Sequence, residues 1–248
     1  MPGYRLYCGN IKPDAHTGTY EGSEGVINIW LIDIRKQIPF LAQLEQVLSP
    51  AERMRAARFH QQKDAQQFII TRAILRILLS DTLMEKPGEI TILSSDNKKP
   101  VLAYRSEVQF NVSHAENYAV IAISKQPVGI DIEFIKPGFD YHSVAEYAFS
   151  TAESDYLKGS SIPDTDFYRI WTRKEAFLKG LGSGLVNDLK QISCLDAAND
   201  ISSTIEGVSS DWELKTIDLS PAYIMSIAYE RTAILNQIFL FDFSQAAL

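Results

Sequence analysis

The same order of secondary-structure elements is predicted twice along this chain, and this repetition restricts the fold more than any other feature. In the first half, alternation and helical periodicity predict a strand, two helices, a long helix and two strands, at residues 26–34, 41–48, 51–59, 68–87, 108–113 and 118–124. In the second half they predict a strand, a long helix and three strands, at residues 128–134, 164–181, 212–217, 222–229 and 237–243. Two short helices, starting at Val144 and Thr151, precede this second long helix.

A repeated order of this kind indicates an α+β fold built from two similar α/β halves. We place the boundary at Gln126 and Pro127, so that the predicted halves are residues 1–127 and 128–248. A chain of 248 residues is long enough for one large domain or for two packed halves. We expect a monomer with its active site in the cleft between the halves. Residues 196–210 are polar and rich in serine, and we expect them to form a surface excursion.

Charge and apolar patterning exclude several classes of protein. The net charge of −7 argues against a nucleic-acid-binding protein, because affinity for phosphate backbones requires clustered Lys and Arg. The N-terminus lacks the apolar run of a signal peptide, and no later run approaches the roughly 18 apolar residues that cross a bilayer. We therefore expect a cytoplasmic protein with no nucleic-acid or membrane partner. Cys8 and Cys194 have no His or Cys nearby at metal-ligand spacing and are expected to be ordinary small residues.

Basic side chains are nonetheless concentrated in one part of the chain. Residues 51–80 carry six of them against two acidic side chains, Glu52 and Asp64. The six basic residues are Arg53, Arg55, Arg58, Lys63, Arg72 and Arg76. A local excess of positive charge in an acidic protein predicts a binding site for a compact anion.

Apolar and acidic residues alternate in the strand predicted at residues 128–134. Because successive side chains of a strand point to opposite faces, Ile130 and Ile132 face one side and Asp131 and Glu133 the other. Two carboxylates about 6 to 7 Å apart on one face repel each other, which favours a cation between them. The simpler explanation is a half-buried strand with a solvated acidic face, and only a third ligand would distinguish the two.

The second long helix supplies a third acidic residue. Trp171, Glu175 and Lys179 are spaced four residues apart, which places them on one stripe of the helix. Taken alone, Glu175 and Lys179 are explained by a surface ion pair worth about 0.3 to 0.5 kcal/mol. Together with Asp131 and Glu133, however, Glu175 completes a set of three carboxylates. Such a set suits Mg²⁺, which prefers oxygen ligands in octahedral geometry.

Ser113 and His114 end the strand that precedes the predicted turn at residues 115–117. Neighbours on a strand point to opposite faces, and no obvious Asp completes a triad, so a Ser/His nucleophile is not expected. A histidine at the end of a strand is better suited to donating a hydrogen bond to a phosphate. A structural histidine bonded to the backbone is the alternative.

Three blocks of this sequence, in this order, resemble the Sfp-type 4′-phosphopantetheinyl transferases, or holo-carrier-protein synthases. They are FNVSHA at 110–115, VGIDIE at 128–133 and WTRKEAFLK at 171–179. Weaker blocks are LSPAERMRAARF at 48–59, followed by Arg72, and the pair Lys99-Pro100. The resemblance covers nearly the whole chain and implies the family's fold, a pseudo-two-fold pair of α/β halves with the active site between them. One departure is Ala115, where the family commonly has a second serine.

The resemblance implies a metal site and a phosphate site. Asp131, Glu133 and Glu175 would hold Mg²⁺ against the pyrophosphate of coenzyme A, the substrate. His114 and Lys179 would contact the phosphates, and both would belong to the catalytic residues together with Glu175.

The resemblance also implies a nucleotide site, to which the first half of the chain would contribute most. Arg55, Arg72 and Lys99 would bind the adenosine 3′-phosphate and neighbouring groups, in agreement with the local excess of positive charge. Ser113 would line this site. Glu153 stands where the family often has a glutamate, and neither the residues nor the resemblance gives it a definite role.

The implied reaction is attack of a serine hydroxyl of an apo acyl or peptidyl carrier protein on the β-phosphate of coenzyme A. The carrier gains 4′-phosphopantetheine, and adenosine 3′,5′-bisphosphate is released. Mg²⁺ would neutralise charge that accumulates on the phosphate oxygens. Glu175 is our candidate for deprotonating the serine, and Lys179 for stabilising the leaving phosphate.

Two other functions remain open at this level. A metal-dependent nuclease or phosphohydrolase also uses acidic residues on a strand with a Glu and a Lys on a helix, although the acidic net charge argues against it. A protein that binds coenzyme A or a carrier without catalysis is the second, although a pure binding protein needs no metal triad. The carrier itself, from fatty-acid, polyketide or peptide synthesis, is not specified by the residues.

Overall fold

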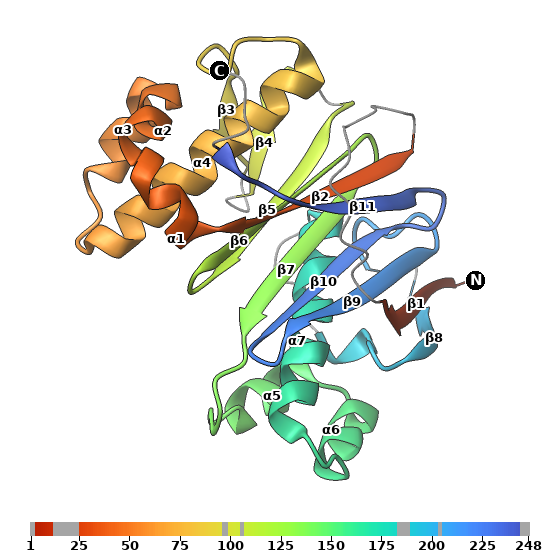
Figure 1. The fold of residues 1–248 in the computed structure, drawn as a ribbon. Coiled ribbons are helices and arrows are strands. Elements are labelled where there is room, and N and C mark those ends of the chain that lie inside the picture. The colour runs from red at the N-terminus through yellow and green to blue at the C-terminus, as the bar shows by residue number, and fades with distance from the viewer. Residues whose placement is uncertain are drawn as a thin grey trace.

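Two β-sheets that pack against each other form the centre of the molecule, and helices cover their outer faces (Figure 1). The structure is a computed structural model and describes residues 3–11, 25–95, 99–104, 107–182, 189–202 and 205–243. The helices are α1 (Ile34–Gln37), α2 (Leu41–Val47), α3 (Pro50–Ala56), α4 (Gln62–Leu83), α5 (His142–Ala148), α6 (Thr151–Lys158) and α7 (Pro163–Leu181). Short 3₁₀ helices lie at Ile38–Phe40 and Leu189–Gln191.

Each sheet belongs mainly to one half of the chain. The first sheet has the strand order β11-β2-β6-β5 and the second β7-β10-β9-β1-β8, while β3 and β4 form a separate pair. The strands of the first sheet and of the separate pair are β2 (Val26–Asp33), β3 (Ile92–Ser94), β4 (Pro100–Leu102), β5 (Gln109–Ala115), β6 (Tyr118–Ser124) and β11 (Ile234–Leu240). Those of the second sheet are β1 (Tyr4–Asn10), β7 (Val128–Phe134), β8 (Ala197–Ile201), β9 (Trp212–Ser220) and β10 (Tyr223–Glu230). The predicted α+β class with two similar halves is thus confirmed.

Each sheet includes one terminal strand from the other half of the chain. The N-terminal β1 pairs with β8 and β9 of the second sheet, and the C-terminal β11 runs parallel to β2 in the first sheet (Figure 1). Strands β1, β3, β4 and β8 were not predicted. Within the surface excursion expected at 196–210, residues Ala197–Ile201 form β8, a mostly exposed edge strand that pairs with β1, whereas residues 203–204 lie outside the described residues.

Three apolar cores hold the layers together. One lies between the first sheet and α1–α4, and a second between the second sheet and α5–α7. The third lies between the two sheets, where Ile130 and Ile132 of β7 meet Ile27 and Ile29 of β2. The alternation in β7 therefore directs its isoleucines to this central core and its acidic residues to the opposite face. No helix in the described ranges has the length and apolar character needed to cross a bilayer.

A capping box begins the same short helix in each half. Ser49 and Glu52 start α3, with Pro50 in its first turn, and Ser150 and Glu153 start α6 in the same way. In both boxes the serine side chain accepts from the backbone of the glutamate, and the glutamate side chain accepts from the backbone of the serine. The two halves therefore resemble each other in these residues as well as in the order of their elements.

A pair of glycines lets α7 contact β7 through the backbone. A Cβ atom on Gly129 would lie 2.0 Å from the carbonyl oxygen of Ala176 and 2.2 Å from the backbone nitrogen of Gly180. A Cβ atom on Gly180 would lie 2.7 Å from the Trp212 side chain. This close approach fixes the distance between the acidic face of β7 and the polar stripe of α7.

We expect Gly129→Ala to destabilise the protein by about 2 kcal/mol or more, because two backbones must separate to admit the methyl group. The measurement is the free energy of unfolding in urea. Gly9→Ala is the matched control, because a Cβ atom on this other strand glycine meets no atom within 4 Å. Equal stability of the two variants would contradict the backbone contact.

Candidate active site

Side chains of β5 join the two sheets at the point where their edge strands meet. The backbone N–H of Ile130 in β7 donates to Asn111 Oδ1 at 2.8 Å, and that of Ile132 donates to Ser113 Oγ at 3.4 Å. These bonds satisfy donors that an edge strand leaves without a partner strand. The sequence analysis missed Asn111, although it belongs to the FNVSHA block. Its amide fixes this block, which contains His114, beside the acidic strand.

Ser113, Asp131 and Lys179 form one polar cluster between β5, β7 and α7. The Ser113 hydroxyl donates to Asp131 Oδ1 at 2.8 Å. The Lys179 ammonium donates to the same Asp131 oxygen at 2.6 Å and to Ser113 Oγ at 3.2 Å. Asp131 is buried, whereas the Lys179 side chain is 30% exposed. The structure thus brings together three of the predicted site residues, from three separate elements.

Glu133 and Glu175 lie within electrostatic reach of this cluster. Burial, followed by repulsion from Asp131, raises the pKa of Glu133 to about 7, and the charge of Glu175 contributes in the same direction. Burial and the Asp131 charge also raise the pKa of Glu175, against the opposing effect of Lys179. Trp171 donates a hydrogen bond to the Glu133 carboxylate. The stripe predicted on α7 therefore faces the acidic side of β7.

The carboxylates of Asp131, Glu133 and Glu175 fit a divalent cation that also binds water or phosphate oxygens. Asp131 Oδ2 is buried and has no hydrogen-bond partner among the described residues, which leaves this oxygen for a ligand. The pKa values of Glu133 and Glu175 are raised first by burial and then by repulsion from Asp131, and a cation would relieve that repulsion. In the described part of the chain, no three His, Cys, Asp or Glu side chains are close enough to hold a metal ion by themselves. The donor set suits Mg²⁺, which commonly completes its shell with water and phosphate oxygens.

A cavity of about 550 Å³, the α3–α4 cavity, is lined by two of the predicted basic residues. Arg55, Arg72 and His114 line it, from α3, α4 and β5. Both guanidinium groups lie over the Phe68 ring, 4.9 Å from its centroid for Arg55 and 5.8 Å for Arg72. The arrangement provides an aromatic face beside two cations, which suits a base or sugar that carries phosphate.

A second cavity, of about 440 Å³, lies on the other side of His114. We call it the aromatic cavity, because Phe134, Phe139, Phe167, Tyr168 and Trp171 line it. His114 and Glu133 line it too, so that it adjoins both the α3–α4 cavity and the acidic face. Desolvation and the nearby Lys179 charge lower the pKa of His114. At neutral pH this histidine is therefore mainly neutral, with one N–H available as a donor.

Lys99 lies at the C-terminus of α7 rather than in either cavity lining. Its ammonium donates to the Lys179 carbonyl oxygen at 2.6 Å, one of the carbonyls that the helix end leaves without an intrahelical partner. Burial lowers the pKa of Lys99 to about 8. The structure therefore connects this predicted residue to the site through the backbone of Lys179.

Glu153 has a structural place outside the site. It is fully buried and forms an ion pair of 2.9 Å with Lys174, which is also fully buried. Glu153 Oε1 accepts from the Cys194 backbone at 2.8 Å, and Lys174 donates to the carbonyls of Leu189 and Ile192. Glu153 thus connects α6, α7 and the segment after α7.

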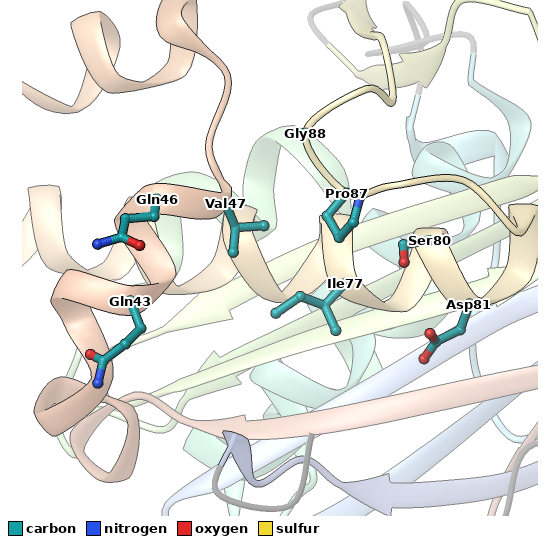
Figure 2. Close-up of a pocket in the computed structure, with 8 residues that line it drawn as sticks. All are labelled: Gln43, Gln46, Val47, Ile77, Ser80, Asp81, Pro87 and Gly88. Carbon is teal, nitrogen blue, oxygen red and sulfur yellow. The ribbon is translucent and has the colours of Figure 1, made fainter. Parts of the chain in front are cut away.

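A third cavity, of about 350 Å³, lies on the outer side of α4 (Figure 2). Gln43, Gln46, Ser80 and Asp81 supply its polar groups. Asp81 is the charged residue in this lining, and burial raises its pKa. A lining with an acid and no base does not suit a phosphate, and none of the predicted site residues lies there.

Both halves of the chain match models of one protein family. Residues 127–228 match the 4′-phosphopantetheinyl transferase superfamily, and residues 36–126 match the model described as 4′-phosphopantetheinyl transferase, N-terminal. The two matched regions meet between Gln126 and Pro127 and together include every predicted site residue.

Curated relatives agree with these matches. The 4′-phosphopantetheinyl transferase HetI of Nostoc sp. is 34% identical over 167 residues, which is 64% of this chain and 70% of that protein. The 4′-phosphopantetheinyl transferase Sfp of Bacillus subtilis is 30% identical over 183 residues, covering 73% of this chain and 81% of its own. The 4′-phosphopantetheinyl transferase psf-1 of Bacillus pumilus is 29% identical over 207 residues, or 82% and 87% of the two chains.

Proposed function

Because this chain belongs to the 4′-phosphopantetheinyl transferase superfamily, we propose that it transfers the 4′-phosphopantetheine arm of coenzyme A to a serine of an apo acyl or peptidyl carrier protein, with Mg²⁺ as cofactor. Adenosine 3′,5′-bisphosphate is the second product. The observation that carries the proposal is the cluster of Ser113, Asp131 and Lys179, in which a buried carboxylate oxygen has no partner among the described residues. A binding protein without catalysis has no need of such an oxygen beside an ammonium group.

In this proposal, each of the two cavities binds a different part of coenzyme A. Arg55 and Arg72 bind the 3′-phosphate in the α3–α4 cavity, where Phe68 offers a ring for the adenine. His114, which lines both cavities, donates to the pyrophosphate between them. The pantetheine arm and the incoming serine use the aromatic cavity. Residues 1–127 thus provide most contacts to the nucleotide, and residues 128–248 the metal ligands and the catalytic helix.

The residues of β7 and α7 carry the chemistry. Asp131, Glu133 and Glu175 would hold Mg²⁺, which when bound neutralises charge on the phosphate oxygens. Glu175 accepts the proton of the carrier serine, a role that its raised pKa favours. Lys179 stabilises the leaving phosphate with the ammonium that here contacts Asp131. Ser113 and Lys99 keep Lys179 in place, through its side chain and its carbonyl respectively.

The proposal is tested by incubating the protein with coenzyme A, Mg²⁺ and an apo carrier domain, followed by mass spectrometry of the carrier. We expect a mass gain of one phosphopantetheine and the release of adenosine 3′,5′-bisphosphate, both lost when a chelator is present. Cleavage of added nucleic acid in place of transfer would favour a nuclease, and coenzyme binding without any product would favour a binding protein. A panel of fatty-acid, polyketide and peptide carriers then identifies the carrier served. The cytoplasmic location and the monomeric state stay predictions.

Glu175→Gln is expected to lower transfer by about 10² to 10⁴-fold, the usual contribution of a general base. Coenzyme A binding, measured by calorimetry, is expected to persist, because the α3–α4 cavity is untouched. Raising the Mg²⁺ concentration separates the two roles of this residue: rescue indicates a ligand, and no rescue indicates a base. Glu146→Gln, on the exposed face of α5, is the control. A fully active Glu175→Gln variant would remove this residue from the mechanism.

A further inference from the structure

Arg76 is a buried cation with hydrogen bonds to Glu52 and to two backbone carbonyls. Its side chain is 2% exposed, and its Nη1 donates to the carbonyl oxygens of Pro87 at 2.6 Å and Ile90 at 2.9 Å. Its Nε donates to Glu52 Oε2 at 2.6 Å. Arg76 is therefore fixed by the loop after α4 on one side and by Glu52 on the other.

Glu52 uses both of its carboxylate oxygens. Oε2 accepts from Arg76 and from the Ser49 backbone N–H at 2.9 Å, and Oε1 lies 3.6 Å from Arg72 Nε. Burial opposes the charged form, but the hydrogen bonds from Arg76 and Ser49 outweigh it and keep the pKa of Glu52 below its usual value. The carboxylate is thus charged and held in place from two helices.

Arg72 is the cation of this group that lines the α3–α4 cavity, and Glu52 lines the cavity beside it. Its side chain is 15% exposed, and burial lowers its pKa, as do the charges of Arg55 and Arg76. Within the described residues, Glu52 is the acidic group that pairs with Arg72. One carboxylate between two guanidinium groups leaves a net positive charge beside the cavity. An anion in the cavity would complete the pairing of Arg72.

We infer that Glu52 is a positioning residue for substrate binding, which fixes the Arg72 guanidinium so that it receives the 3′-phosphate of the coenzyme. The order of contacts runs from the loop carbonyls through Arg76 and Glu52 to Arg72. The oxygens of Glu52 contact Ser49, Arg76 and Arg72, so that Glu52 acts on the anionic substrate through Arg72. This inference rests on the proposed function, because that function supplies the 3′-phosphate.

Glu52→Gln tests this role with little change of shape. A glutamine at this position can retain the capping box of α3 and an oxygen for Arg76, and it removes the negative charge that Glu52 shares between Arg72 and the buried Arg76. Loss of a negative charge beside the cavity would by itself strengthen anion binding. Weaker anion binding by Glu52→Gln would therefore show that Glu52 acts by positioning Arg72 and not through its own charge.

The readout is the affinity for adenosine 3′,5′-bisphosphate and for adenosine 5′-monophosphate, measured by calorimetry without metal. We expect Glu52→Gln to lose about tenfold in affinity for the bisphosphate, equivalent to about 1.4 kcal/mol, and little for the monophosphate. Comparing two ligands on one variant cancels any partial loss of folded protein. Unchanged or tighter bisphosphate binding would overturn the role of Glu52, as would an equal loss for both ligands.

Two further variants complete the test. Glu52→Gln combined with Arg72→Gln is expected to bind the bisphosphate no more weakly than Arg72→Gln alone, because Glu52 acts through Arg72. Additive losses would contradict this. Glu45→Gln, the same change at an exposed position of α2, is the matched control. Absence of carrier modification by the wild-type protein would overturn this inference together with the proposed function, whereas wild-type transfer with unchanged variant affinity would overturn the role of Glu52 alone.

Discussion

Asp131→Asn is expected to lower kcat/KM for transfer by about 10³-fold, comparable with the loss of a group that stabilises transition-state charge. The change retains the size of the side chain and an oxygen that can accept from Ser113 and Lys179. It places an amide N–H₂ where the carboxylate has a buried oxygen without a partner among the described residues. An amide nitrogen cannot bind a cation, so the site would lose its central ligand.

Two measurements and a control variant separate this effect from a loss of structure. The affinity for adenosine 3′,5′-bisphosphate is expected to stay near the wild-type value, because the basic residues of the α3–α4 cavity are unchanged. Thermal unfolding measures the stability lost when the buried Asp131 no longer pairs with Lys179. Asp140→Asn is the matched control, since Asp140 is exposed and accepts a turn hydrogen bond from the His142 backbone that asparagine also accepts. Wild-type kcat/KM in Asp131→Asn would remove the acidic face of β7 from the chemistry.

Glu153→Gln is expected to destabilise the fold by about 3 to 5 kcal/mol, the usual cost of breaking a buried ion pair by removing one partner. Glu153 accepts from the Ser150 and Cys194 backbones with separate oxygens, whereas glutamine has one acceptor oxygen. The change therefore removes one of these bonds as well as the charge that neutralises Lys174. Lys174 then remains buried as an unpaired cation. The measurement is the free energy of unfolding in urea.

The exposed pair of Asp155 and Lys158 on the same helix provides the control. Lys158 Nζ and Asp155 Oδ1 lie 3.0 Å apart, but both side chains are more than half exposed. Asp155→Asn is therefore expected to change stability little. A double-mutant cycle of Glu153→Gln and Lys174→Met tests the pairing itself. The combined loss is expected to be smaller than the sum of the single losses, and simple additivity would contradict a direct ion pair.

Local patterns predicted much of the fold. The strands β6 and β7 have the predicted bounds, and α7 ends at Leu181 as expected, because alternation and helical period report which face is buried. The strands β1 and β8 were missed. Strand β1 pairs with β8 on one side and with β9 on the other. Residues nearly two hundred positions apart in sequence leave no local signal of such pairing.

The candidate site was predicted in its residue types and only partly in its contacts. Alternation in β7 and the four-residue spacing on α7 predicted the acidic face, and the local charge excess predicted an anion site. The resemblance to the family singled out Arg55 and Arg72 within that site. Nothing in the sequence indicated that Asn111 joins the sheets or that Glu52 pairs with Arg72. Lys99 was predicted to bind phosphate, whereas its ammonium here caps α7.

The sequence by itself determined which residues share a face, because the periods of strand and helix are local properties of the backbone. The sequence therefore predicted that Asp131, Glu133 and Glu175 form one acidic set, and its blocks indicated the family. The tertiary structure alone decided which faces meet. The contact of Gly129 with α7 and the pairing of the terminal strands depend on distances between segments remote in sequence, and these distances decide which buried charge neutralises another.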